Sequence, residues 1–154
     1  MTATFSMAAI GHVDGGRSTA TDDAWGPSRA SIVLAPSFAA EALAGLDSFS
    51  HAEIVFVFDR LPESEITTAA RRPRGNPDWP LVGIFAQRGR NRPNRIGISM
   101  CRIIAVTGTR LDVEGLDAIH GTPVLDIKPV LAGFLPRGTR REPDWASAIM
   151  ADYW

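Results

Sequence analysis

Arginine is the residue type that most clearly points to chemistry in this sequence. Nine arginines fall between Arg60 and Arg102 against only three acidic residues, whereas the whole 154-residue chain carries a net charge of −1. Lys128 is the single lysine, and guanidinium groups favour planar, bidentate contacts with phosphate or carboxylate. This concentration of positive charge in one segment predicts a basic face that binds an anionic ligand. The alternative is a solvated loop whose arginines pair with surface acids.

Several common catalytic motifs are missing. The sequence has neither a Gly-x-Gly-x-x-Gly loop nor a P-loop, so it predicts no dinucleotide or nucleoside triphosphate site of those kinds. His12, His51 and His120 are far apart and Cys101 is isolated, so no metal site is expected, and Ser99 lacks the Gly-x-Ser-x-Gly elbow of hydrolases. These absences suit a reaction in which a bound cofactor carries the activated group and the protein mainly aligns the reactants.

The elements that must position such a site are mainly strands. No segment shows sustained helical periodicity, and short β-branched or aromatic runs alternate with turn residues, as in barrels and sandwiches. The run 54–58 has no polar alternation and is predicted to be a central strand covered on both faces. Gly108 marks a hairpin connection. Strands are expected at residues 4–13, 30–35, 53–58, 81–85, 98–106 and 110–115.

The remaining segments are one short helix, two long loops and a tail. Ser37 can cap a helix that Gly45 ends. The connections 60–80 and 86–95 are rich in arginine and proline, which is typical of shaped binding loops. The polar tail, residues 137–154, is expected to pack on a neighbouring subunit or to lie loosely on the surface.

The composition indicates one globular domain. The hydrophobic fraction is 45%, no apolar run is long enough to span a bilayer, and the first residues do not resemble a secretion signal. A cytoplasmic location and no membrane partner are therefore expected. Cys101, placed among apolar residues, is expected to pack in the core.

Four blocks in one order carry a family resemblance over about residues 8–131. They resemble the TsaA/TrmO (YaeB-like) family, whose members methylate N6 of adenosine 37 in tRNA. The resemblance implies a single β-barrel domain over residues 1–136, outside the Rossmann class, with S-adenosyl-L-methionine as cofactor and a homodimer as the assembly. The blocks are Gly45-Leu46-Asp47-Ser48-Phe49-Ser50-His51 running into residues 53–58, then Gly83-Ile84-Phe85-Ala86-Gln87-Arg88, then Arg92-Pro93-Asn94-Arg95-Ile96-Gly97, and lastly Gly115-Leu116-Asp117 with residues 121–129.

The resemblance also implies which residues bind the cofactor. Arg88 offers a guanidinium to its carboxylate or hydroxyls, and the alternative role is a loop salt bridge. The turn 117–120 cradles the adenosyl part through main-chain groups in the family, although His120 stands where relatives often have an acid. The full set implied is Arg88, Asp59, Arg60, Ile98, Asp117, Ala118, Ile119, His120, Gly26 and Pro27.

Substrate-binding candidates lie mostly in the basic loops. Trp79 has arginines beside it and can stack on an RNA base, and Trp25 is a second stacking candidate or a hydrophobic plug. Arg92 and Asn94 either contact cofactor or RNA or hold their loop by backbone hydrogen bonds. The full set is Arg90, Arg92, Asn94, Arg95, Trp79 and Lys128.

His51 and Asp126 are the residues expected to act in catalysis, and Asp59, at the end of the central strand, is a further candidate for the general base. His51 precedes the central strand and either lies near the substrate or buttresses the barrel. Asp126 shares a face with Lys128, so the two either serve the site or form a structural ion pair. The function expected is methylation of (threonylcarbamoyl)adenosine 37 in a tRNA anticodon loop. The alternatives are a non-catalytic S-adenosylmethionine-sensing or RNA-binding barrel, and a methyltransferase for a small molecule.

Overall fold

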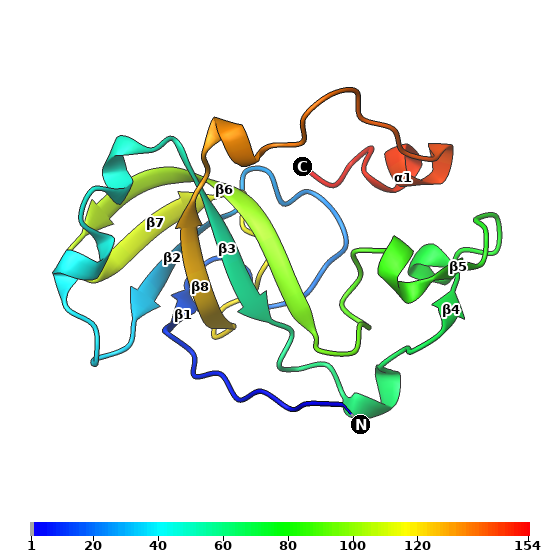
Figure 1. Ribbon diagram of the computed structural model, residues 1–154, viewed down its shortest axis with the longest axis horizontal. Coiled ribbons are helices and arrows are strands. Elements are labelled where there is room, and N and C mark those ends of the chain that lie inside the picture. The colour runs from blue at the N-terminus through cyan, green and yellow to red at the C-terminus, as the bar shows by residue number, and fades with distance from the viewer. Residues whose placement is uncertain (1) are drawn as a thin grey trace.

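Six strands close into an antiparallel barrel in the computed structural model, which describes residues 2–154 (Figure 1). Their order around the barrel is β1-β2-β7-β6-β3-β8, and β4 and β5 form a separate two-stranded sheet. The mainly β class and the barrel are thus confirmed. The bounds are β1 Gly11–Asp14, β2 Arg29–Leu34, β3 His51–Val57, β4 Ala70–Arg71, β5 Val82–Gly83, β6 Ile96–Thr107, β7 Arg110–Glu114 and β8 Pro123–Pro129.

The barrel interior is the hydrophobic core. Along β3, Ala52, Ile54 and Phe56 are buried and alternate with less buried residues, because successive strand side chains point to opposite faces. The prediction that this strand is covered on both faces is therefore wrong for its outer face, where Val55 and Val57 are only half-buried. It is nevertheless central, since β6 and β8 pair with its two edges.

Strand β6 is the longest strand and joins two parts of the barrel. Its first half pairs with β3 and its second half with β7. The register with β7 shifts between Ile103 and Ala105, an irregularity that bends a strand and increases its twist. This bend lets one strand follow the curvature of a six-stranded barrel.

The expected strands match the observed ones unevenly. The predicted strand 4–13 begins only at Gly11, and residues 81–85 form a two-residue strand followed by a 3-10 turn. Strand β8 was not in the predicted set, because Pro123 and Pro129 limit it and Asp126 and Lys128 interrupt its apolar pattern. Closure of the barrel between β1 and β8 needs this strand.

Helical structure is short and lies elsewhere than expected. The segment after Ser37 forms only a 3-10 turn with no side-chain cap, and the α-helix α1, Asp144–Ile149, lies in the tail. Among residues 2–154, no helix has the length and apolar character needed to cross a membrane. The 3-10 turns are η1 Ala40–Leu43, η2 Leu46–Ser48, η3 Glu63–Glu65, η4 Pro73–Gly75, η5 Ile84–Ala86 and η6 Ala132–Phe134.

The tail does not lie loosely. It leaves the barrel after β8, passes through α1 beside the β4–β5 lobe, and returns toward the loop after β1 (Figure 1). There Ala24 N donates to Asp152 O at 2.8 Å and Trp25 N donates to Tyr153 O at 2.7 Å. The tail therefore packs on its own chain, and its packing on a neighbouring subunit stays a prediction.

Candidate functional site

Three long connections meet at one mouth of the barrel. They are residues 15–28 between β1 and β2, residues 58–95 between β3 and β6, and residues 115–122 between β7 and β8. Because neighbouring strands in this barrel are antiparallel, the ends of β1, β3 and β7 all lie at the same mouth. We call this end the site mouth, and all the residues that the family resemblance assigns to the cofactor lie in or beside these connections.

Arg60 joins two of these connections. Its Nη2 donates to the main-chain oxygen of His120 at 3.0 Å, which links the end of β3 to the turn before β8. The His120 ring accepts a hydrogen bond from Gly15 N at Nδ1, 3.0 Å away, and His120 N donates to Arg17 O at 2.7 Å. The turn 117–120 is thus fixed from both sides, by the loop after β1 and by the loop after β3.

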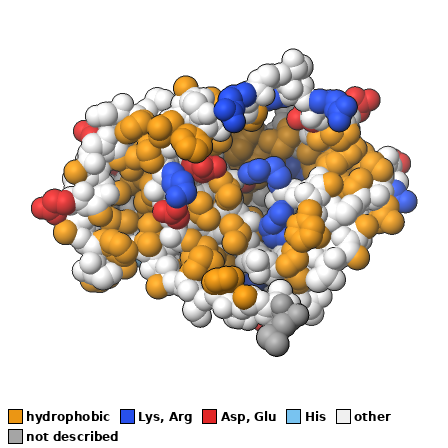
Figure 2. Space-filling model, viewed as in Figure 1, with side chains coloured by type: hydrophobic (Ala, Val, Ile, Leu, Met, Phe, Trp, Pro, Cys, Tyr) orange, Lys and Arg blue, Asp and Glu red, His pale blue; other side chains and the backbone are white. Residues whose placement is uncertain are grey.

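Arg88 reaches the barrel from the long loop. Its Nη2 donates to the main-chain oxygen of Ile98 on β6 at 2.8 Å, and the exposed guanidinium keeps further N–H donors for a ligand. Ile98 itself is 40% exposed. Figure 2 shows a hollow between the barrel and the lobe that contains α1, with basic side chains gathered in it. Arg88 and Ile98 therefore present a cationic and an apolar surface side by side.

Asp117 has both carboxylate oxygens bound within the protein. The hydroxyl of Ser99, which is 4% exposed, donates to Oδ1, and the phenol of Tyr153 donates to Oδ2. The carboxylate therefore connects β6 and the tail through hydrogen bonds, and both of its oxygens already have a partner within the protein. Tyr153 was missed at the sequence level, because only folding brings it to a residue 36 positions earlier.

Most loop arginines hold protein carbonyl groups. Arg92 Nη1 donates to Gln87 O at 2.9 Å and Arg95 Nη1 donates to Leu61 O at 3.0 Å. For Arg92 this favours the loop-holding alternative. Of the other candidates in this loop, Arg90 and Asn94 are exposed. The alternative that these arginines pair with surface acids holds for two residues of the segment 60–102. Arg74 pairs with Asp23, and Arg102 pairs with Glu114.

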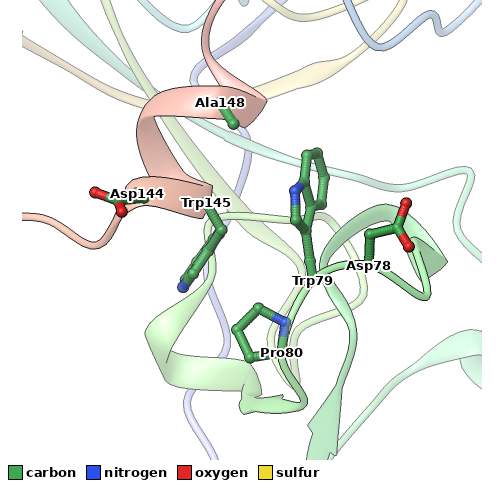
Figure 3. A pocket seen from close by; sticks show the side chains of 6 residues that line it. All are labelled: Asp78, Trp79, Pro80, Asp144, Trp145 and Ala148. Atoms are coloured by element: carbon green, nitrogen blue, oxygen red, sulfur yellow. The ribbon is translucent and has the colours of Figure 1, made fainter.

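A second hollow lies between α1 and the loop that follows η4. It is an open pocket of about 390 Å³, lined by Asp78, Trp79, Pro80, Asp144, Trp145 and Ala148. In Figure 3, Trp145 points into it from α1 and Trp79 from the loop. Trp145 was not predicted as a site residue, since it lies 66 positions after Trp79 in the sequence.

Trp25 is a hydrophobic plug. It is 3% exposed, its Nε1 donates to Thr21 O at 3.0 Å, and the Arg17 guanidinium lies 4.3 Å from the centre of its ring. Its ring is therefore engaged by the protein. The neighbouring Gly26 packs so closely on the tail that a Cβ atom there would lie 2.7 Å from the carbonyl carbon of Trp154. Pro27 is exposed next to it.

The two residues expected to act in catalysis lie away from this mouth. His51 starts β3, about 20 Å along the strand from its other end, and its Nδ1 lies 2.8 Å from the hydroxyl oxygen of Ser50. Asp126 lines a separate cavity of about 470 Å³ that Ile10 and Leu34 also line. The structure therefore does not bring His51 or Asp126 together with Arg60 and Arg88 in one chain.

Asp126 and Lys128 form an ion pair, which agrees with the predicted alternative of a structural ion pair rather than a role in the site. Lys128 Nζ lies 2.7 Å from Asp126 Oδ2, and this contact raises the pKa of Lys128. Both lie on the outer face of the barrel, beside Val55 and Glu53 of β3. Lys128 therefore lies on β8, apart from the basic loops that hold the other predicted substrate-binding residues.

Cys101 is fully buried, and burial raises the pKa of its thiol to about 12. The thiolate is the nucleophilic form of cysteine, so this residue packs in the core as expected. Among residues 2–154, no three His, Cys, Asp or Glu side chains are grouped so that they could hold a metal ion.

The fold and the site define the structural class of this protein. It is a single closed β-barrel in which the side chains of Arg60 and Arg88 and the turn 117–120 lie at the same mouth. The chain belongs to the family described as the tRNA-methyltransferase O N-terminal domain, whose family model matches residues 22–134.

Individual relatives agree with this membership. The chain is 40% identical over 93 residues to the tRNA (adenine(37)-N6)-methyltransferase of Homo sapiens, covering 60% of this chain and 21% of that protein. It is 40% identical over 105 residues to the Escherichia coli (strain K12) protein of the same name, covering 64% and 43%. A crystal structure of TrmO from P. aeruginosa aligns with a TM-score of 0.75 at 30% identity, covering 94% of this chain and 63% of that one. The chain thus spans less than half the length of these two curated relatives.

Proposed function

We propose that this protein is an S-adenosyl-L-methionine-dependent methyltransferase that acts on N6 of adenosine 37, or of its threonylcarbamoyl derivative, in tRNA. The observation that carries the proposal is the meeting of Arg60, Arg88 and the turn 117–120 at one mouth of the barrel. Family membership and the names of the relatives support it.

The donors at the site mouth fit such a cofactor. Arg60 and Arg88 each use one nitrogen on a main-chain oxygen and keep other N–H groups for a carboxylate. Ile98 offers apolar surface for the adenine ring, and main-chain groups of residues 117–120 can pair with its polar edge. When bound, the cofactor supplies a methyl group on a positively charged sulfur, and a carbon–nitrogen bond forms as the carbon–sulfur bond breaks.

The protein's own contribution is binding, orientation and acceptance of a proton. The proton on the attacking nitrogen must pass to a base, and a threonylcarbamoyl group on that nitrogen makes the proton more acidic. Asp59 is exposed and directly precedes Arg60 at the site mouth, whereas Asp126 and His51 lie elsewhere. We therefore propose Asp59 as the proton acceptor in place of these two.

The tRNA would lie along the basic connection 58–95. Arg71 and Arg90 carry guanidinium groups for phosphates, and phosphate contacts of this kind supply affinity without sequence readout. Trp79 offers a face for an unstacked base of the single-stranded anticodon loop. A tRNA substrate in turn implies a cytoplasmic location.

We further propose that the working unit is a homodimer. Large apolar side chains besides Ile98 remain exposed on β6 and on the segments near it: Met100 at 50%, Phe85 at 77% and Phe134 at 88%. Apolar surface of this kind is typical of protein interfaces. A second copy of the chain, packed against the outer face of β6, would cover it beside Arg88.

Two measurements test the function. Calorimetry with S-adenosyl-L-methionine is expected to show one site per chain. Incubation of tRNA with the protein and methyl-labelled cofactor, followed by mass spectrometry of the nucleosides, is expected to place label on the adenosine 37 derivative. Binding without label on any adenosine derivative would contradict the proposed reaction, and absence of binding would contradict the proposed cofactor.

A further inference from the structure

The last residues of the tail lie against the site mouth rather than against the barrel wall from which the tail departs. Besides the two main-chain hydrogen bonds from Ala24 and Trp25 to residues 152 and 153, Arg74 Nη2 lies 3.3 Å from Ile149 O and 2.7 Å from Asp23 Oδ1. The loop 15–28, the basic loop and the tail are therefore tied together at one place.

The contact at Gly26 is close. Because a Cβ atom on this residue would lie 2.7 Å from the carbonyl carbon of Trp154, only glycine allows the tail to approach this far. The ring of Trp154 packs edge-on against that of Tyr153, with centres 4.8 Å apart. Residues 152–154 therefore form a packed layer over the loop that holds Gly26.

The contact at Asp117 is polar. Asp117 begins the turn 117–120, and its Oδ2 accepts the hydrogen bond of the Tyr153 phenol. Burial and the Asp117 carboxylate both raise the pKa of Tyr153, so the phenol stays a neutral donor. Without it, a half-buried carboxylate oxygen would lack this partner, and such losses weaken local structure. Two of the proposed cofactor-binding residues thus contact the end of the tail, Gly26 at Trp154 and Asp117 at Tyr153.

We propose that residues 152–154 form an outer wall of the cofactor site, and that Tyr153 is a positioning residue that fixes the turn 117–120 through its hydrogen bond to Asp117. The inference rests on the proposed function for the identity of the cofactor. The new element is that the site includes residues 152–154, which lie outside the residues 22–134 that the family model matches.

The first test measures cofactor affinity. We expect Tyr153→Phe to weaken S-adenosyl-L-methionine binding by about threefold to tenfold, as for loss of one hydrogen bond to a carboxylate, and truncation after Ala151 to weaken it further. In turnover, KM for the cofactor should rise more than kcat falls. Arg140→Ala, on the exposed part of the same tail, is the matched control and should bind normally. Normal affinity in a truncated protein that still melts cooperatively would overturn the proposal.

The second test does not depend on cofactor. Tyr153 is the only tyrosine, so absorbance at 295 nm follows this one phenol, and we expect it to ionise above the ordinary tyrosine pKa and only as the tail is released. Amide exchange at residues 118–121 should be faster in Tyr153→Phe than in the unaltered protein. If the full chain binds no cofactor, the proposed function fails, and this experiment still decides the positioning role. Unchanged exchange in Tyr153→Phe would refute that role.

Discussion

The guanidinium of Arg60 donates a 3.0 Å hydrogen bond to the main-chain oxygen of His120, 60 residues further along the chain. This contact joins the connection after β3 to the turn before β8. The side chain thereby serves two purposes in the proposed site: one nitrogen holds the turn in place, and the remaining N–H groups face a ligand.

Replacing Arg60 should therefore impair binding in two ways. We expect Arg60→Ala to weaken S-adenosyl-L-methionine binding by at least about tenfold, since it removes a charged donor and frees the turn. Arg60→Lys should keep the positive charge but lose the planar arrangement of N–H donors of the guanidinium group. Its affinity for the cofactor should therefore be intermediate. Titration calorimetry measures both variants, with Arg137→Ala as a control for charge. Wild-type affinity in Arg60→Ala would exclude this residue from the site.

The half-buried Arg71 and the exposed Arg90 of the basic connection should contribute to RNA binding and not to cofactor binding. We expect Arg71→Ala and Arg90→Ala to weaken tRNA binding and to reduce the slope of log affinity against log salt by about one each. Cofactor binding should be unchanged in both variants. Filter binding over a series of salt concentrations measures the slope, and an unaltered slope would remove these residues from the proposed RNA surface.

Gly97 is a packing glycine. It lies opposite Phe56 in the β3–β6 register, and a Cβ atom there would lie 2.5 Å from Cζ of the Phe56 ring. Gly97→Ala should lower the free energy of unfolding by about 1–3 kcal/mol, as overpacking of a core does. Gly89→Ala is the matched control, because nothing lies within 4 Å of its Cβ position. Urea denaturation compares the two, and equal stabilities would show that the barrel accommodates the methyl group.

Cys101 should be inert in the folded protein. With the pKa of its buried thiol raised to about 12, almost no thiolate exists at pH 8. Ellman's reagent at that pH should leave the native protein unlabelled and should label one thiol per chain in guanidinium chloride. Rapid labelling without denaturant would mean that the strand containing Cys101 opens readily.

Glu114 should contribute to the acid sensitivity of the fold. Hydrogen bonds from Arg102 and then Arg29 lower its pKa. A carboxyl group whose pKa is lower in the folded state stabilises the fold above its unfolded pKa, and that stabilisation is lost as pH falls through the folded pKa. Melting temperatures measured from pH 7 to pH 3 should therefore fall less steeply for Glu114→Gln than for the unaltered protein. Glu41→Gln, at an exposed position, should follow the unaltered curve.

How much of the fold the sequence predicts depends on the element. Strands β2, β3, β6 and β7 follow from β-branched runs bounded by turn residues, which is local information. Strand β8 lacks such a run, and it exists because β1 and β3 offer it hydrogen-bonding edges. The helix near Ser37 was misplaced for a related reason, since a weak local signal yields to the packing of its surroundings.

The candidate site divides in the same way. The sequence by itself determined the basic connection, since charge is a property of neighbouring residues, and the turn 117–120 followed from the family resemblance that the sequence carries. Only the tertiary structure separated Arg92 and Arg95, which hold their own loop, from Arg60 and Arg88, which reach the turn and β6. It also decided that His51 and Asp126 lie away from the site mouth, and that Tyr153 reaches Asp117. These relationships join residues far apart in the chain, and the closure of the barrel and the path of the tail set them.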